Sequence, residues 1–154
     1  MDESDSDPNP QREQPFPPRF NLLMAEDNLP DVLLVREAIR MENLPLEVHV
    51  VPDGEQAIDF CLRADTDPLA PCPHFLLLDL NLPKKDGFEV LRWLRASRNY
   101  KEVLVLIMTS SDSPTDQNQI AELGAAYFRK PSSYLDFLKI GAVLKQLLKD
   151  GGVS

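Results

Sequence analysis

Residues 75–83 read Phe-Leu-Leu-Leu-Asp-Leu-Asn-Leu-Pro, an apolar run that holds a single carboxylate, Asp79. A short apolar run bounded by turn residues is typical of a strand that is buried on both faces of a sheet. An ionised carboxylate is costly in apolar surroundings unless it is paired or bound to a cation. In open α/β sheets, ligands bind outside the carboxyl ends of the strands. Asp79 is therefore a candidate functional residue.

The composition is typical of one globular domain. The chain has 154 residues, of which 43% are hydrophobic and 27% are charged, which is enough for one hydrophobic core. The net charge of −9 disfavours binding to nucleic acid or to an anionic membrane. No apolar run approaches the roughly 20 residues of a membrane span, and no secretory signal is evident. We therefore expect a cytoplasmic protein without nucleic-acid or membrane partners.

The two ends of the chain are expected to lie outside the folded domain. Residues 1–18 are acidic, polar and rich in proline, and such a segment cannot bury enough apolar surface to offset its ordering entropy. We predict a disordered tail over 1–18, one domain over 19–150, and a flexible C-terminus over 151–154.

Cys61 and Cys72 have neither metal-site nor CxxC spacing and are expected to be reduced, structural thiols.

Short apolar runs alternate with amphipathic stretches along the domain. Strands are expected at residues 20–25, 46–51, 75–79, 103–108 and 125–128. Helix starts are expected near Pro30, Asp53, Asp86, Ser113 and Ser133, because these residue types favour a cap or a first turn. Five repeats of strand then helix predict an α/β, doubly wound (βα)5 three-layer sandwich with a five-stranded parallel sheet.

In such a fold the ends of the five strands meet at one edge of the sheet. The polar residues expected there are Glu26, Asp27, Asp79, Thr109 and Lys130. Carboxylates that lie close together raise each other's pKa, and a hard divalent cation removes that repulsion. We expect Mg²⁺ bound by Glu26, Asp27, Asp79 and the backbone carbonyl of Asn81.

Lys130 and Thr109 add an ammonium group and a hydroxyl group to this edge. Together with the cation, they could bind the oxygens of a phosphoryl group on Asp79, and an aspartyl phosphate is an established covalent intermediate. The two histidines, His49 in a strand and His74 in a loop, are expected to be structural.

The order of these residues resembles the receiver domain of two-component response regulators. The resemblance covers residues 20 to about 149 and rests on Glu26-Asp27, on Asp79 after three leucines, on Thr109-Ser110 and on Lys130-Pro131. It implies a CheY-like fold in which Asp79 accepts phosphate from a phosphohistidine of a sensor histidine kinase. The protein would then be a phosphoacceptor with only self-phosphorylation and autodephosphorylation activity.

The resemblance also implies the roles of the other site residues. Lys130 would bind the phosphoryl group, Thr109 would move toward it, and Tyr127 would rotate inward behind Thr109. A cis peptide bond is implied between Lys130 and Pro131. Asn81 and Ser111 occupy the positions that the family uses to tune the lifetime of the phosphoryl group.

Three short segments resemble the single-domain regulators that partner bacterial phytochromes, especially cyanobacterial ones. They are Asn28-Leu-Pro30, the proline-rich loop before residue 75, and residues 128–134. The resemblance implies a phytochrome kinase as partner. The chain ends shortly after its last helix, so we expect output through a downstream protein or a phosphorelay.

The last helix is expected to be apolar on more than one face, and such a helix is usually covered on both. We therefore predict a homodimer that forms through the fourth helix, the fifth strand and the last helix.

Two alternatives to a phosphoacceptor stay open. A phosphatase would need a second aspartate two residues after Asp79, where Asn81 stands. A receiver-shaped binding module would never take phosphate.

Overall fold

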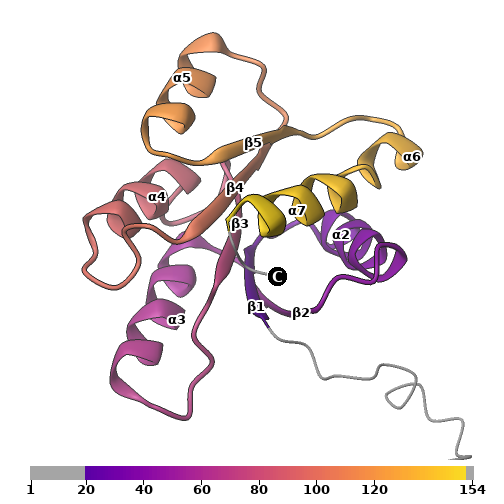
Figure 1. The fold of residues 1–154 in the computed structure, drawn as a ribbon. Coiled ribbons are helices and arrows are strands. Elements are labelled where there is room, and N and C mark those ends of the chain that lie inside the picture. The colour runs from indigo at the N-terminus through magenta and orange to yellow at the C-terminus, as the bar shows by residue number, and fades with distance from the viewer. Residues whose placement is uncertain (1–19, 152–154) are drawn as a thin grey trace, which may run out of the picture.

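The computed structural model describes residues 20–151. The tail predicted over 1–18 and residues 152–154 of the predicted flexible end lie outside the described residues. The described part is the predicted α/β sandwich, in which a parallel sheet lies between two layers of helices (Figure 1). None of the helices within residues 20–151 is long and apolar enough to cross a membrane.

The sheet has five strands within the described residues. They are β1 (Phe20–Ala25), β2 (Leu46–Val51), β3 (Phe75–Asp79), β4 (Leu104–Thr109) and β5 (Ala126–Arg129). Their order is β2-β1-β3-β4-β5, and each neighbouring pair is parallel. Strand β3 lies at the centre and is buried along its whole length, as its apolar sequence predicted. Strands β4 and β5 each begin one residue later than expected.

Helices cover both faces of this sheet. They are α2 (Leu29–Met41), α3 (Gly54–Thr66), α4 (Gly87–Ala96), α5 (Pro114–Glu122), α6 (Tyr134–Phe137) and α7 (Ile140–Asp150). Side chains alternate between the faces along a strand. Leu76 and Leu78 of β3 therefore pack with α3, α4 and α5. Phe75 and Leu77 pack with α2, α6 and α7 on the other face.

The helix starts follow the capping residues in the sequence. Asp53 accepts a hydrogen bond from the backbone N–H of Gln56 at 2.7 Å. Asp86 and Glu89 form a reciprocal capping box at the start of α4. These side chains satisfy backbone N–H groups that have no partner within the helix. The caps therefore fix where α3 and α4 begin after β2 and β3.

The last helix differs from the prediction, because it is divided into α6 and α7. Between them, the backbone N–H groups of Lys139 and Gly141 donate to carbonyls three residues back, at 3.1 Å each. A Cβ on Gly141 would lie 2.8 Å from the carbonyl oxygen of Ala38. Helix α7 thus packs very closely on α2, and a tight turn separates it from α6.

The peptide bond between Lys130 and Pro131 is trans, because the described residues contain no cis peptide bond. The prediction of a cis bond, which came from the family resemblance, is therefore wrong for this structure. The trans form is the ordinary preference of X-Pro bonds by about 0.5–1 kcal/mol.

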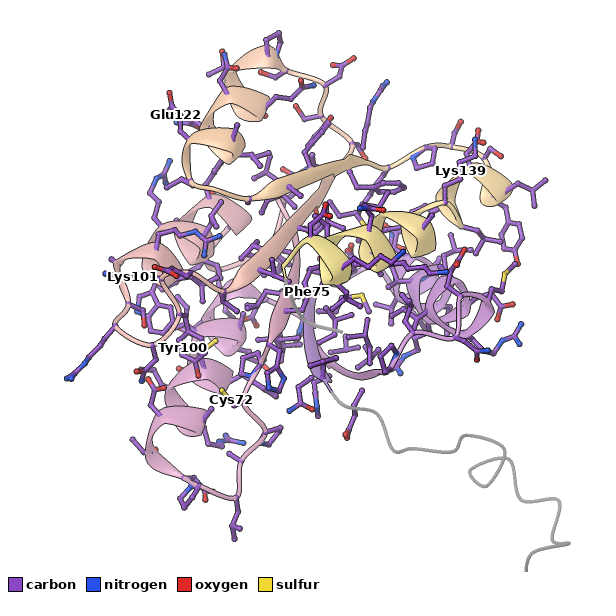
Figure 2. The ribbon with its side chains drawn as sticks, in the orientation of Figure 1. Cys72, Phe75, Tyr100, Lys101, Glu122 and Lys139 are labelled. Atoms are coloured by element: carbon purple, nitrogen blue, oxygen red, sulfur yellow. The ribbon has the colours of Figure 1, made fainter. Side chains whose placement is uncertain are left out.

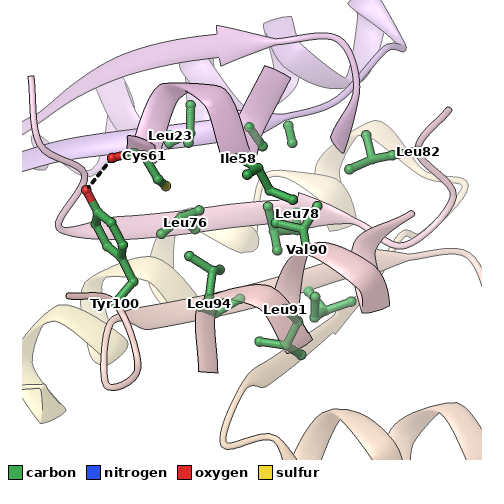
Figure 3. Packing of buried hydrophobic residues seen from close by; sticks show 14 of the residues in the cluster. Leu23, Ile58, Cys61, Leu76, Leu78, Leu82, Val90, Leu91, Leu94 and Tyr100 are labelled. Carbon is green, nitrogen blue, oxygen red and sulfur yellow. Dashed lines mark hydrogen bonds between the residues drawn. The ribbon is translucent and has the colours of Figure 1, made fainter. Parts of the chain in front are cut away.

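The core between α3, α4 and the sheet contains one buried tyrosine with a satisfied hydroxyl. The Tyr100 hydroxyl donates to the carbonyl oxygen of Cys61 at 3.0 Å (Figure 3). Cys72 lies beside the same hydroxyl, with its Sγ 3.9 Å away (Figure 2). Both cysteines are free thiols, and this agrees with their predicted structural role.

Both histidines bind Asn21 near the start of β1. His49 Nε2 lies 3.0 Å from the Asn21 side-chain oxygen. His74 Nδ1 accepts a hydrogen bond from the Asn21 backbone N–H at 3.0 Å. These contacts tie β2 and the loop before β3 to β1, at the edge opposite the carboxyl ends of the strands. The histidines are therefore structural, as expected.

Candidate functional site

The carboxyl ends of β1 and β3 bring three acidic side chains together. Carboxylate oxygens of Glu26, Asp27 and Asp79 all lie within 4.8 Å of one another. Glu26 and Asp79 are buried, with 2% and 6% of their surface exposed, whereas Asp27 is exposed. The neighbouring positions of β1 and β3 in the sheet bring Asp79 next to Glu26 and Asp27, which lie more than 50 residues earlier in the sequence. The sequence predicted all three members.

Lys130, just after β5, extends its ammonium group into the acidic cluster. Its Nζ donates to Glu26 Oε1 at 2.9 Å and to Asp79 Oδ2 at 3.0 Å. Its backbone N–H donates to the carbonyl oxygen of Thr109 at 2.8 Å. This last bond continues the β4–β5 ladder and fixes the position of the Lys130 backbone. The cation therefore lies directly against the carboxylate at the end of β3.

A further acid, Asp31, was not predicted from the sequence. Its Oδ2 accepts a hydrogen bond from Lys130 Nζ at 2.7 Å. Asp31 lies in the first turn of α2, where an acidic residue is common because it complements the helix dipole. The sequence carries no other signal for it. Its contact with a lysine 99 residues further along the chain depends on the tertiary fold.

Burial and the neighbouring charges perturb two pKa values at the site. Burial raises the pKa of Glu26 to about 7, the hydrogen bond from Lys130 opposes this, and the neighbouring Asp79 carboxylate adds to it. Burial alone would favour the neutral amine of Lys130, but its three carboxylate partners hold its pKa above the usual value. The site thus has more negative than positive charge, which favours the binding of a cation.

The residues at this edge fit a hard divalent cation. Carboxylate and carbonyl oxygens are the ligands that such ions prefer, and the three acids present them within one small volume. The backbone N–H of Asn81 donates to Asp79 Oδ1 at 3.0 Å, so the Asn81 backbone lies next to the cluster.

Helix α4 also approaches this end of β3. A Cβ on Gly87 would lie 2.6 Å from the carbonyl oxygen of Asp79. Helix α4 therefore begins directly against the end of β3.

Thr109 ends β4, the strand next to β3, and its side chain is fully buried. The Thr109 hydroxyl oxygen accepts a hydrogen bond from the backbone N–H of Ser111 at 3.0 Å. The Ser111 hydroxyl in turn donates to Asp116 Oδ2 at 2.9 Å. The hydroxyl of Tyr127 on β5 donates to the Ser111 carbonyl. The loop after β4 is thus joined both to Thr109 and to β5.

An apolar hollow lies beside the acidic cluster. Its lining residues are Glu26, Asp27, Leu29, Val32, Leu33, Arg36, Val50 and Pro52. Leu29 and Leu33 on α2 are 65% and 57% exposed. The sequence predicted a helix here with one apolar face, but it did not predict that these two leucines would be exposed beside the site.

Comparisons with known proteins agree with this geometry. The Response regulator receiver domain family matches residues 22–140. Response regulator Rcp1 of Synechocystis sp. is 33% identical over 125 residues, which cover 80% of this chain and 84% of the relative. The chain is also similar to the probable methanogenesis regulatory protein FilR2 of Methanothrix harundinacea, with 30% identity over 128 residues, which cover 82% of each chain.

Solved structures give the same result. The phosphorylated cyanobacterial phytochrome response regulator RcpA has a TM-score of 0.75 and 29% identity, covering 83% of this chain and 92% of its own. The Mn²⁺-bound form of Rcp1 has a TM-score of 0.75 and 30% identity, covering 83% and 93%. The fold, the acidic cluster with its lysine, and these matches agree: the chain belongs to the receiver domain family of two-component response regulators, which are signalling proteins.

Proposed function

We propose that Asp79 is the phosphoacceptor and that it takes a phosphoryl group from a phosphohistidine of a sensor histidine kinase. A carboxylate oxygen of Asp79 attacks phosphorus, the P–N bond breaks, and the histidine leaves with its electron pair and takes a proton. The observation that carries this proposal is the 3.0 Å contact between Asp79 Oδ2 and the Lys130 ammonium, within a cluster of acids. Phosphoryl transfer depends mainly on such positioning and charge neutralisation.

Mg²⁺ is the metal ion that we propose for this site. Glu26, Asp27 and Asp79 would hold it, together with the carbonyl of Asn81. When bound, it would supply positive charge to the phosphoryl oxygens. The acidic cluster and the Mn²⁺-bound relative support a divalent cation, and Mg²⁺ is our choice because it typically binds one or two carboxylates together with phosphate.

Thr109 and Tyr127 are proposed to report the phosphorylated state. The Thr109 hydroxyl would turn toward the phosphoryl group, and Tyr127 would rotate inward behind it. This is supported by the hydrogen bonds that join Thr109 and Tyr127 to the same residue, Ser111. A shift of Thr109 would move Ser111, in the loop after β4, and the Tyr127 hydroxyl donates to the carbonyl of that residue. We further propose that Asn81 and Ser111 tune the phosphoryl lifetime.

A phytochrome is the sensor kinase that we propose as partner. The support is the similarity to the phytochrome regulator RcpA, and to the bacteriophytochrome regulator RtBRR, at 35% identity and a TM-score of 0.68. The test is transfer from a panel of autophosphorylated histidine kinases with radiolabelled phosphate. We expect a phytochrome kinase to label the protein fastest. Preferential labelling by a kinase of another type would contradict the partner but leave Asp79 as acceptor.

Output is proposed to pass through a downstream protein, and self-association is proposed for α5, β5 and α6–α7. Tyr134 and Leu135 of α6 are 56% and 72% exposed, so two large apolar side chains on that part of the surface are open to a partner. The test is sedimentation velocity with and without a phosphoryl analogue. A monomer under both conditions would contradict the homodimer.

A further inference from the structure

The ammonium group of Lys130 has no free N–H in this structure. A lysine ammonium has three N–H donors, and three carboxylates accept from it: Glu26 at 2.9 Å, Asp31 at 2.7 Å and Asp79 at 3.0 Å. The side chain of Lys130 is only 13% exposed, so water does not compete strongly for these donors. To bind a phosphoryl oxygen, Lys130 must release one of its three partners.

Two of the three partners belong to the proposed chemistry itself. Glu26 and Asp79 are members of the acidic cluster, and a cation there would compete with Lys130 for their oxygens. Asp79 would also carry the phosphoryl group. Asp31 lies outside that cluster and has neither role. It is therefore the partner that Lys130 can keep through both metal binding and phosphorylation.

Asp31 is held firmly relative to β1. The side chain of Asn28 accepts a hydrogen bond from the Asp31 backbone N–H at 3.0 Å. The backbone N–H of Asn28 donates to Glu26 Oε2 at 3.1 Å. This chain of contacts fixes the first turn of α2 to the end of β1. The Asp31 carboxylate, whose side chain is 17% exposed, is thus held in place beside the Lys130 ammonium.

We propose that Asp31 is a positioning residue that keeps the Lys130 ammonium beside Asp79 while Glu26 binds the metal and Asp79 carries the phosphoryl group. This proposal rests on the proposed function. Lys130 then keeps its bond to Asp31 and redirects the N–H that now faces Asp79 Oδ2 to a phosphoryl oxygen.

The test measures binding of beryllofluoride, a phosphoryl mimic, to the full chain in saturating Mg²⁺ by calorimetry. We expect Asp31→Ala to weaken binding about tenfold, as expected for the loss of one charge-assisted hydrogen bond. Asp31→Asn keeps an oxygen acceptor without the charge and should lie between Asp31→Ala and the wild type. Glu37→Ala is the matched control, because it removes one negative charge from the same helix, at an ion pair with Arg40. It should bind like the wild type.

A second readout does not depend on metal or phosphoryl binding. In protein labelled with ¹⁵N-lysine, a Nζ held by three carboxylates should exchange slowly with solvent and give a resolved signal for Lys130. Asp31→Ala should broaden that signal, and Glu37→Ala should leave it sharp.

A double-mutant test returns to beryllofluoride binding. In a Lys130→Met background, Asp31→Ala should no longer weaken that binding, because Asp31 acts through Lys130.

The outcomes separate the two proposals. If the wild type does not bind beryllofluoride, or Asp79→Asn binds it equally well, the proposed function fails. If the wild type binds and Asp31→Ala binds equally well or more tightly, Asp31 does not position Lys130, and the inference fails. Weakening that persists in the Lys130→Met background would also overturn it.

Discussion

Glu26 illustrates how tertiary structure sets the properties of a single side chain. The sequence placed an acid at the end of β1, but the sequence does not show how far that acid is buried. In the structure, burial is the largest of the effects that raise its pKa to about 7. Asp31 illustrates a different limit, since an acidic first turn is ordinary and its partner Lys130 is remote in sequence. The acids at the strand ends and their position at one edge were predictable, whereas the raised pKa of Glu26 and the contact of Asp31 with Lys130 were not.

Glu26→Gln should stabilise the metal-free protein at pH 8. The pKa of Glu26 rises from its ordinary 4.5 to about 7 on folding, chiefly because the side chain is buried. The folded state therefore binds the proton more tightly, and stability is lost as the pH rises from 4.5 to 7. We expect a gain of about 1–3 kcal/mol for the variant at pH 8, shrinking toward pH 5. The measurement is urea unfolding in EDTA at both pH values.

Two further results would complete that test. Asp27→Asn, at the exposed member of the same cluster, should change stability little at either pH. Added Mg²⁺ should stabilise the wild type more than Glu26→Gln, because the variant lacks a ligand. A loss of stability in Glu26→Gln at pH 8 would show that burial does not govern this carboxyl group.

Elements were predictable wherever a cap and an apolar pattern coincided. Helices α3 and α4 begin directly after the predicted caps Asp53 and Asp86, and β1 and β2 have the predicted bounds. The division of the last helix into α6 and α7 was not predictable, because no glycine or proline in the sequence marks it between Phe137 and Ile140. Capping residues in the sequence therefore predict where a helix begins, whereas its path depends on the helix against which it packs.

Asp86→Ala should destabilise the protein by about 1 kcal/mol, the typical value of an N-cap. The Asp86 side chain accepts from the Glu89 backbone N–H at 2.9 Å, and this bond would be lost. Asp86→Asn should retain most of the stability, since asparagine also caps helices well. Urea unfolding at pH 7 gives both values. Equal losses in the two variants would mean that charge rather than the cap stabilises α4.

At the scale of the whole molecule, the sequence predicted a five-stranded parallel sheet, and the structure confirms this architecture. The homodimer stays a prediction. It relied on an apolar last helix, but Ile140, Leu144 and Leu148 are buried within the chain itself. Exposed apolar side chains include Tyr134 and Leu135 on α6, and Leu33 on α2, which borders the site. Amphipathic patterns do not show which apolar residues the fold leaves exposed.

Leu33→Asp should slow phosphotransfer from the cognate kinase about tenfold or more, because a partner that reaches Asp79 must approach this apolar hollow. Labelling by acetyl phosphate, a small donor, should be unchanged. The measurement is the rate of each reaction with purified protein. Leu69→Asp is the matched control, since Leu69 is 92% exposed in the loop between α3 and β3. Equal slowing by both variants would contradict a contact at α2.

Phosphorylation of Asp79 is the central claim, and mass spectrometry of the intact protein tests it most directly. The protein is incubated with acetyl phosphate and Mg²⁺, and the modified residue is then located by peptide mapping after borohydride reduction. We predict that the wild type gains one phosphoryl group on Asp79, that EDTA prevents this, and that Asp79→Asn gains none. A wild type that stays unmodified, or an Asp79→Asn variant that is modified to the same extent, would contradict the account.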